Sequence, residues 1–266
     1  MKRTIIITLA MLIIFGGAVI FGAGRISEGW QKPQHDDVAL SAVSPVERVN
    51  SELKEYSFEK FESFAGQPPY DDWYRQCKHL KADPTDGMLT YAEAAAQGGT
   101  WAEKFCTDLD LNDKTIALEL ITLPKEYNGS TVFCGYYYNE EETVYTVAYL
   151  IDAFTGKLVY LYYNAPHLRV PYTEKFKHIE EFDDFTTVEE KGRDIVYALG
   201  HSKNNATIST AARTYQGSGN LVESQYKTKD GTVYMFRYCA DKENNYPLTE
   251  LANCTVLFNQ TEIEIK

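Results

Sequence analysis

The sequence predicts an α+β protein, in which an N-terminal transmembrane helix precedes units that each combine one helix with an antiparallel meander. Three observations predict this class. Residues 4–24 form a run of 21 residues without charge or proline, directly after Lys2 and Arg3. Beyond this run, helix-capping patterns are followed by β-branched and tyrosine-rich segments that are separated by turn residues. This order occurs twice, which predicts two units.

The charge of the chain narrows the classes of partner. It has 266 residues, with 26 Lys and Arg against 38 Asp and Glu, which gives a net charge of −12. Nucleic acids favour clustered basic residues, so we expect no nucleic-acid binding. Adhesion to anionic lipid through a basic patch is excluded for the same reason. The 44% hydrophobic and 24% charged content is typical of a folded globular body.

Residues 1–24 predict a signal anchor. About 20 helical residues cross a hydrocarbon core of about 30 Å, so the uncharged run is long enough to span a membrane. The cations Lys2 and Arg3 favour a cytoplasmic N-terminus. A cleaved signal peptide, cut near Gly24, is the alternative. Both interpretations place the rest of the chain outside the cytoplasm, either on a single-pass anchor in the cell membrane or secreted.

Two connecting segments are expected before the first unit. Residues 25–44 are polar and predict a stalk, and residues 45–84 predict a helical neck. Ser44 and Glu47 have the spacing of a capping box, and apolar residues at three- and four-residue spacing follow. The neck helix is expected to end near Gly66.

The first unit is predicted over residues 85–170. Thr90 and Glu93 form a capping box that opens a helix extending to about Phe105. Alternating apolar and β-branched residues then predict the strands of a meander. These strands are expected at 115–122, 131–138, 143–151 and 157–163.

The second unit is predicted over residues 171–266. Thr186 and Glu189 form the next capping box, of a helix ending at Gly200. The strands are expected at 207–215, 221–228, 232–239 and 254–258. Asp230-Gly231 predicts a type I′ hairpin turn between the second and third of these strands.

Two further patterns connect the units to each other and to a known family. Residues 144–152 and 233–241 share Val, Tyr, Tyr and Asp at the same offsets, which favours an internal repeat. Residues 149–159, YLIDAFTGKLV, predict a hairpin. A helix before a meander with this hairpin is similar to the cystatin-like PepSY-type extracytoplasmic domains, in which Val-Asp-Ala-x-Thr-Gly-x-Val recurs. The resemblance covers about 70 residues of the first unit, while residues 241–245 of the second unit lack the Thr-Gly step. It implies a non-catalytic binding role, and some such domains are implicated in restraining peptidases.

One segment has the ligand spacing of a calcium loop. Asp108, Asp110, Asn112 and Glu119 fall at positions 1, 3, 5 and 12 of an EF-hand pattern. The sixth position, which needs glycine, is Asp113, and the residues after it predict a strand instead of the exiting helix. We therefore interpret the segment as a solvated acidic turn, with a calcium site as the alternative.

No catalytic residue or cofactor is predicted. The five histidines lack the spacing of a zinc helix, and the chain has neither a Gly-x-Ser-x-Gly elbow nor a phosphate-binding glycine loop. Five cysteines leave at least one without an intramolecular partner. Cys239 and Cys254 are the candidate disulfide, and buried free thiols are the alternative.

Tyrosines on the first meander are the candidate binding face, because tyrosine offers a large contact area at low entropic cost. The alternative is that the rings simply cover the sheet. The candidate residues are Tyr136, Tyr138, Tyr145, Tyr149, Tyr160 and Tyr162. We therefore expect a membrane-anchored extracytoplasmic binding or regulatory module that is not an enzyme and whose partner is a protein or peptide. The alternatives are an extracytoplasmic hydrolase with a dispersed site and a surface assembly or adhesion component that uses strand addition.

Overall fold

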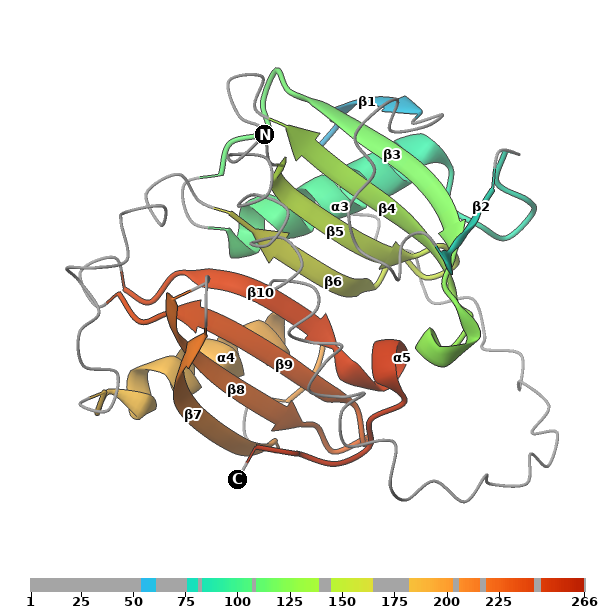
Figure 1. The fold of residues 1–266 in the computed structure, drawn as a ribbon. Coiled ribbons are helices and arrows are strands. Elements are labelled where there is room, and N and C mark those ends of the chain that lie inside the picture. The colour runs from blue at the N-terminus through green and yellow to red at the C-terminus, as the bar shows by residue number, and fades with distance from the viewer. Residues whose placement is uncertain are drawn as a thin grey trace, which may run out of the picture.

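The computed structural model contains a mixed sheet of ten strands and three α-helices in the part of the chain that it describes. The sheet order is β1-β3-β4-β5-β6-β10-β9-β8-β7, and β2 pairs with β3 beside this path (Figure 1). The described residues are 54–60, 76–80, 83–106, 109–138, 145–164, 182–202, 206–215, 219–241 and 245–265.

The predicted class, α+β behind an N-terminal transmembrane helix, is wrong, because these described residues make the protein mainly β. The described strands all belong to one sheet, and the three α-helices accompany it. None of the described helices has the length and apolarity to cross a membrane. The predicted anchor, 1–24, and the stalk, 25–44, lie outside the described residues.

The first helix and meander form as predicted. Helix α3 begins after Thr90, whose Oγ1 accepts from the Glu93 N–H at 3.2 Å while Glu93 Oε2 accepts from the Thr90 N–H at 2.8 Å. This confirms the capping box. The elements are α3 (Tyr91–Phe105), β3 (Thr115–Thr122), the 3₁₀ helix η2 (Lys125–Tyr127), β4 (Thr131–Tyr138), β5 (Tyr145–Asp152) and β6 (Leu158–Tyr163). Strands β3 to β6 are antiparallel neighbours.

The second helix and its strands differ from the prediction at both ends. The elements are α4 (Phe185–Ala198), β7 (Thr207–Tyr215), β8 (Gly219–Lys227), β9 (Val233–Cys239), β10 (Leu248–Asn253) and α5 (Cys254–Phe258). The N-cap of α4 is Asp184, so the predicted cap at Thr186 is wrong. The predicted strand at 254–258 is also wrong. Asn253 ends β10 and its Oδ1 accepts from the Val256 N–H at 3.1 Å, which starts a helix there.

Glycines shape the end of α4 and the loop between β8 and β9. Gly200 has φ of +97°, and the N–H groups of Gly200 and His201 bond to the carbonyls of Tyr197 and Val196, as in a Schellman motif. In the loop at 229–231 only Gly231 has positive φ, at +88°. The type I′ prediction is therefore wrong, and the loop is of the three-residue kind with glycine in the left-handed region.

Strands occupy the described parts of the predicted helical neck. They are β1 (Ser57–Lys60) and β2 (Lys78–His79). Strand β1 pairs with β3 in parallel and β2 pairs with β3 antiparallel. Main-chain pairing with β3, distant in sequence, outweighs the local helical spacing here, which makes the helix prediction wrong for these residues.

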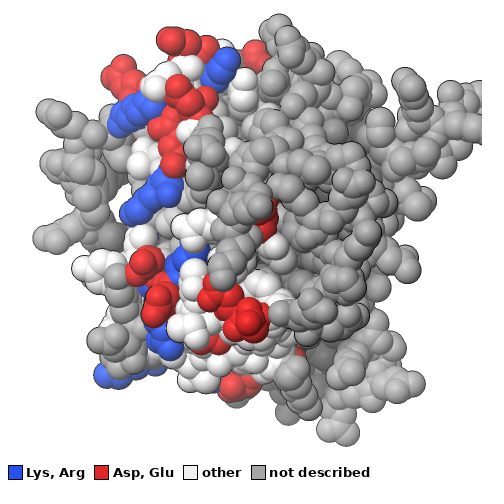
Figure 2. Space-filling view, turned by 90° about the vertical axis from the view of Figure 1, so that its left-hand side faces the viewer, with Lys and Arg blue, Asp and Glu red and all other residues white. Residues whose placement is uncertain are grey.

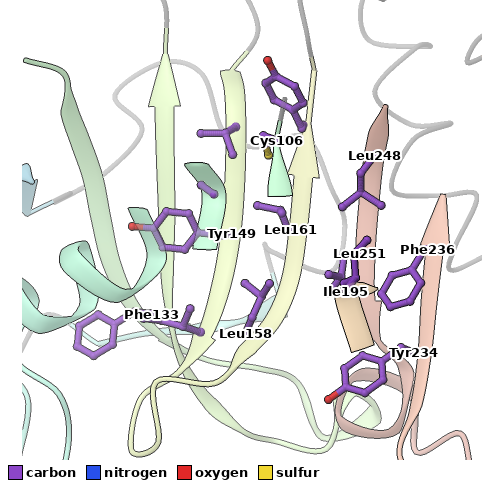
Figure 3. Close-up of a cluster of buried hydrophobic side chains, with 14 of the residues drawn as sticks. Cys106, Phe133, Tyr149, Leu158, Leu161, Ile195, Tyr234, Phe236, Leu248 and Leu251 are labelled. Carbon is purple, nitrogen blue, oxygen red and sulfur yellow. The ribbon is translucent and has the colours of Figure 1, made fainter. Parts of the chain in front are cut away.

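The two meanders meet at a seam in the middle of the sheet. Strands β6 and β10 pair antiparallel, with Leu161 opposite Leu251. Helices α3 and α4 cover the same face of the sheet on either side of this seam (Figure 1). Side chains under both helices belong to one hydrophobic cluster, which Figure 3 shows from Phe133 to Tyr234. The predicted domain boundary near residue 170 lies outside the described residues, so the division into two domains stays a prediction.

Each long helix approaches the sheet at a glycine that accommodates a tyrosine ring. A Cβ on Gly98 of α3 would lie 2.1 Å from Cε2 of Tyr149, and one on Gly192 of α4 would lie 2.1 Å from the hydroxyl oxygen of Tyr226. Tyr149 and Tyr226 are both fully buried. The close approach of each helix to the sheet therefore requires that these helical positions lack a side chain.

Glu103 joins the segment before β1 to α3 and makes the stability of the fold depend on pH. Burial alone would raise the pKa of Glu103, but hydrogen bonds from Lys54, Tyr56 and the Leu111 N–H outweigh it and lower this pKa. A lowered folded pKa stabilises the protein above the unfolded value of about 4.3, and that contribution is lost as the pH falls through the folded pKa.

Replacing Glu103 with glutamine is therefore expected to destabilise the fold at pH 7 and to have a smaller effect at pH 3. Urea unfolding of both proteins at the two pH values measures the difference. An equal loss at pH 3 and pH 7 would contradict an ionised carboxylate as the source of this stability.

Candidate functional site

The turn between β5 and β6 is built around one aspartate. Asp152 Oδ1 accepts hydrogen bonds from the Phe154 N–H at 3.1 Å and from the Thr155 N–H and hydroxyl, both at 2.8 Å. Gly156 follows with φ of +69°, and its N–H donates to the Asp152 carbonyl at 2.9 Å. These bonds determine the backbone path of the turn without support from a partner.

The same turn is anchored to its surroundings on both sides. The Ala153 N–H donates to the Thr131 carbonyl at 3.0 Å, and the Ala153 carbonyl accepts from the Leu89 N–H at 2.7 Å. Ala153 is completely buried, whereas the neighbouring Phe154 is 53% exposed. The turn thus presents one large aromatic side chain on a rigid base, and such preorganised aromatics are typical anchors of protein interfaces.

The predicted tyrosine face is mostly inside the protein. Tyr149 points toward α3, while Tyr136, Tyr160 and Tyr162 belong to the cluster on the opposite face of the sheet. All four are less than 9% exposed. The side chains of Tyr138 and Tyr145 lie outside the described residues. The four described rings therefore cover the sheet and present no exposed contact area.

Sequence reasoning missed Phe154 as an exposed aromatic. The pattern Asp-Ala-Phe-Thr-Gly at 152–156 contained a usable signal, because turn-forming residues on both sides leave the phenylalanine at the tip. The other exposed large apolar side chain among the described residues is Tyr197, which is 61% exposed near the end of α4.

The predicted calcium ligands do not converge where the structure describes them. Asp110 Oδ1 accepts from the Asn112 N–H at 2.8 Å, which closes a local turn. Glu119 is buried on β3, and its Oε1 lies 2.6 Å from Nδ1 of His79. Asp108 lies outside the described residues. Within the described ranges, no group of three or more His, Cys, Asp or Glu residues is arranged to hold a metal ion.

A buried row of charges crosses β8, β9 and β10 on the sheet face opposite α3 and α4. Arg237 donates through Nε to Glu223 at 2.9 Å and through Nη1 to Glu250 at 2.6 Å. The three side chains are only 5–8% exposed, and they are direct cross-strand neighbours. The guanidinium thus binds both buried carboxylates. We interpret this network of charges as part of the structure of the sheet and not as a binding site.

The five cysteines are buried and form no disulfide, so the candidate Cys239–Cys254 bridge is absent and the alternative of buried thiols is confirmed. Cys239 ends β9 beside Pro247, to whose carbonyl its N–H donates. Cys254 follows Asn253, which pairs with Tyr234 at the opposite end of β9. Cys239 is therefore at one end of β9, and Cys254 lies near the other end of this strand.

Burial keeps the thiols of Cys77, Cys106 and Cys134 protonated. It raises the pKa of Cys77 to about 12, with further contributions from Glu119 and Glu126, and it raises the pKa values of Cys106 and Cys134 well above their ordinary range. The nucleophile in thiol chemistry is the thiolate, so burial suppresses its formation at these positions.

All five cysteines are therefore expected to resist a thiol reagent such as DTNB at pH 8 in the folded protein and to react together after unfolding. Absorbance at equal protein concentration, with and without urea, counts the reactive thiols. One thiol that reacts within seconds in the absence of urea would contradict the burial described above.

The surface charge is mixed. Figure 2 shows Lys and Arg interspersed with Asp and Glu among the described residues on one side of the molecule. Such a mixture is typical of a solvated surface, and the described residues on this side form no large basic patch.

The fold and turn define a mainly β protein with a rigid, aromatic-tipped hairpin. No family model, curated protein or solved structure matches the chain. The resemblance to PepSY-type domains therefore stays a prediction.

Proposed function

We propose that the chain is a membrane-anchored extracytoplasmic binding or regulatory module whose partner is a protein or peptide, and that it acts without catalysis. The observation that carries the proposal is Phe154, a half-exposed aromatic on a turn whose backbone is already fixed. A partner that buries this ring gains apolar contact without ordering the turn, so little conformational entropy is lost on binding.

The buried polar groups support the same proposal. Glu223, Arg237 and Glu250 bind one another inside the sheet. The sheet is thus a rigid support, and a rigid support with a functional loop is a common arrangement in binding proteins. The membrane part of the proposal rests on the uncharged run at 4–24.

Photo-crosslinking in native membranes tests the binding site. The photoreactive residue p-benzoylphenylalanine replaces Phe154 in the full chain, and the matched control carries it in place of Tyr197, the other exposed aromatic among the described residues. We expect a discrete adduct with one protein or peptide from position 154 and none of that size from position 197.

A competition experiment shows whether the ring itself is recognised. Purified full-length protein should suppress the adduct, whereas the Phe154→Ala variant should not, and Lys157→Ala in the same turn should compete like the unmodified chain. Identical adducts from both positions, or equal competition by Phe154→Ala, would contradict a role for this turn.

A further inference from the structure

The two ends of the sheet differ in how they are protected against further strands. At one end, β1 has four residues, including the charged Glu59 and Lys60, and three of its side chains are exposed. Short strands and charged side chains are the usual protection of a sheet edge. At the other end, β7 has nine residues and pairs with β8 over its whole length without a register shift.

Strand β7 carries almost none of these protective features. Its sequence, TISTAARTY, contains neither proline nor an acidic residue, and Arg213 is its only charge. Among the described residues, β7 pairs with β8 alone and its other edge forms the border of the sheet (Figure 1). A long, nearly uncharged edge without a bulge is a ready template for one more strand.

The described side chains of β7 contact the core, the neighbouring strand and the C-terminal segment. Ile208 and Ala212 are partly buried against the core under α4. Thr210 Oγ1 lies 3.0 Å from Ser224 Oγ on the neighbouring strand, and Ser209 Oγ donates to the Ile265 carbonyl at 2.8 Å. The first of these contacts joins β7 to its own sheet, and the second joins it to the C-terminal segment.

We propose that β7 binds the β7 strand of a second copy of this chain, in antiparallel register about Ala211. In this register Ala211 lies opposite its own equivalent, Thr210 opposite Ala212, and Arg213 opposite Ser209, by the spacing of β7. The centre of the contact therefore holds small side chains. In this register Arg213 of one copy does not lie opposite Arg213 of the other, so like charges do not meet there.

A second copy fits this edge better than an unrelated strand. A two-fold axis through Ala211 makes each strand both template and partner, so the contact closes after two copies. The chain already joins its own halves by the same kind of contact, because β6 and β10 pair antiparallel at the seam. Pairing at β7 would continue the sheet from one copy into the next.

Charge substitutions at position 211 test this proposal on the full chain in detergent. Ala211→Lys and Ala211→Glu each place like charges opposite each other on the axis, and an equimolar mixture places Lys opposite Glu. Light scattering should show a dimer for the unmodified chain, a several-fold weaker dimer for each variant, and recovery in the mixture. Ser57→Lys on β1 is the matched control and should leave the dimer unchanged.

Introduced cysteines provide a second measurement of the register, because the native thiols are buried. Ala211→Cys should form an intermolecular disulfide under mild oxidation in membranes, and Ser57→Cys should not. A strictly monomeric unmodified chain, a dimer indifferent to both charge variants, or a mixture no tighter than either variant would overturn the proposal. Equal crosslinking of the Ser57→Cys and Ala211→Cys variants would overturn it as well.

Discussion

Replacing Arg237 with methionine is expected to lower the free energy of unfolding by about 3–5 kcal/mol. The guanidinium binds Glu223 and Glu250, and both carboxylates are almost completely buried. Without it, two negative charges remain in the sheet interior without their shared counter-charge. Urea unfolding followed by circular dichroism measures the loss.

Removing the two carboxylates together with the guanidinium separates the charge effect from the packing effect. The triple variant Glu223→Leu, Arg237→Met, Glu250→Leu is expected to recover most of the stability that Arg237→Met loses, because well-packed apolar groups often replace a buried ion network without cost. A triple variant as unstable as Arg237→Met would show that the network contributes more than mutual neutralisation.

Gly98→Ala is expected to destabilise the protein by about 1–3 kcal/mol or more, although alanine is the better helix former by about 1 kcal/mol. The added Cβ would lie 2.1 Å from the ring of Tyr149, which is buried and cannot move aside. Overpacking therefore outweighs helix propensity, and α3 must shift away from β5. Thermal and urea unfolding measure the change.

Replacing the Tyr149 ring with a smaller side chain tests whether the clash with the added Cβ causes this loss of stability. The double variant Gly98→Ala, Tyr149→Val should lose less stability than the sum of its two single variants, because the clash is absent once the ring is gone. Gly192 and Tyr226 form the corresponding contact under α4, so Gly192→Ala should also destabilise the protein. A stabilising effect of Gly98→Ala would contradict the close approach of helix and sheet.

The sequence predicted those parts of the fold that depend on neighbouring residues. The Thr90–Glu93 cap needs only four consecutive positions, and the apolar and β-branched runs that predict β3 and β4 span eight. Strand β10 was missed because it is stabilised by β6 and β9 on its two sides, and its own short segment shows no clear alternation. The seam between β6 and β10, which joins the two meanders into one sheet, is likewise a contact between distant segments.

The candidate site was harder to predict than the strands. Alternation shows that Tyr160 and Tyr162 share one side of the sheet, but not that this side is covered. Burial of a ring depends on what packs over it, and α3 over Tyr149 is a distant segment in the sequence. Phe154 is exposed because the turn projects beyond these layers, and the local turn motif alone carries that information.

Labelling of one introduced cysteine in intact cells tests most directly whether the described sheet lies on the extracytoplasmic side of the membrane. Lys125 is exposed on η2, and the native thiols are buried, so Lys125→Cys in the full chain provides a single reactive position. We expect labelling by a membrane-impermeant maleimide in intact cells, with the labelled chain in the membrane fraction or, if residues 1–24 are cleaved, in the medium. Labelling only after lysis would contradict the proposed location and the binding role that depends on it.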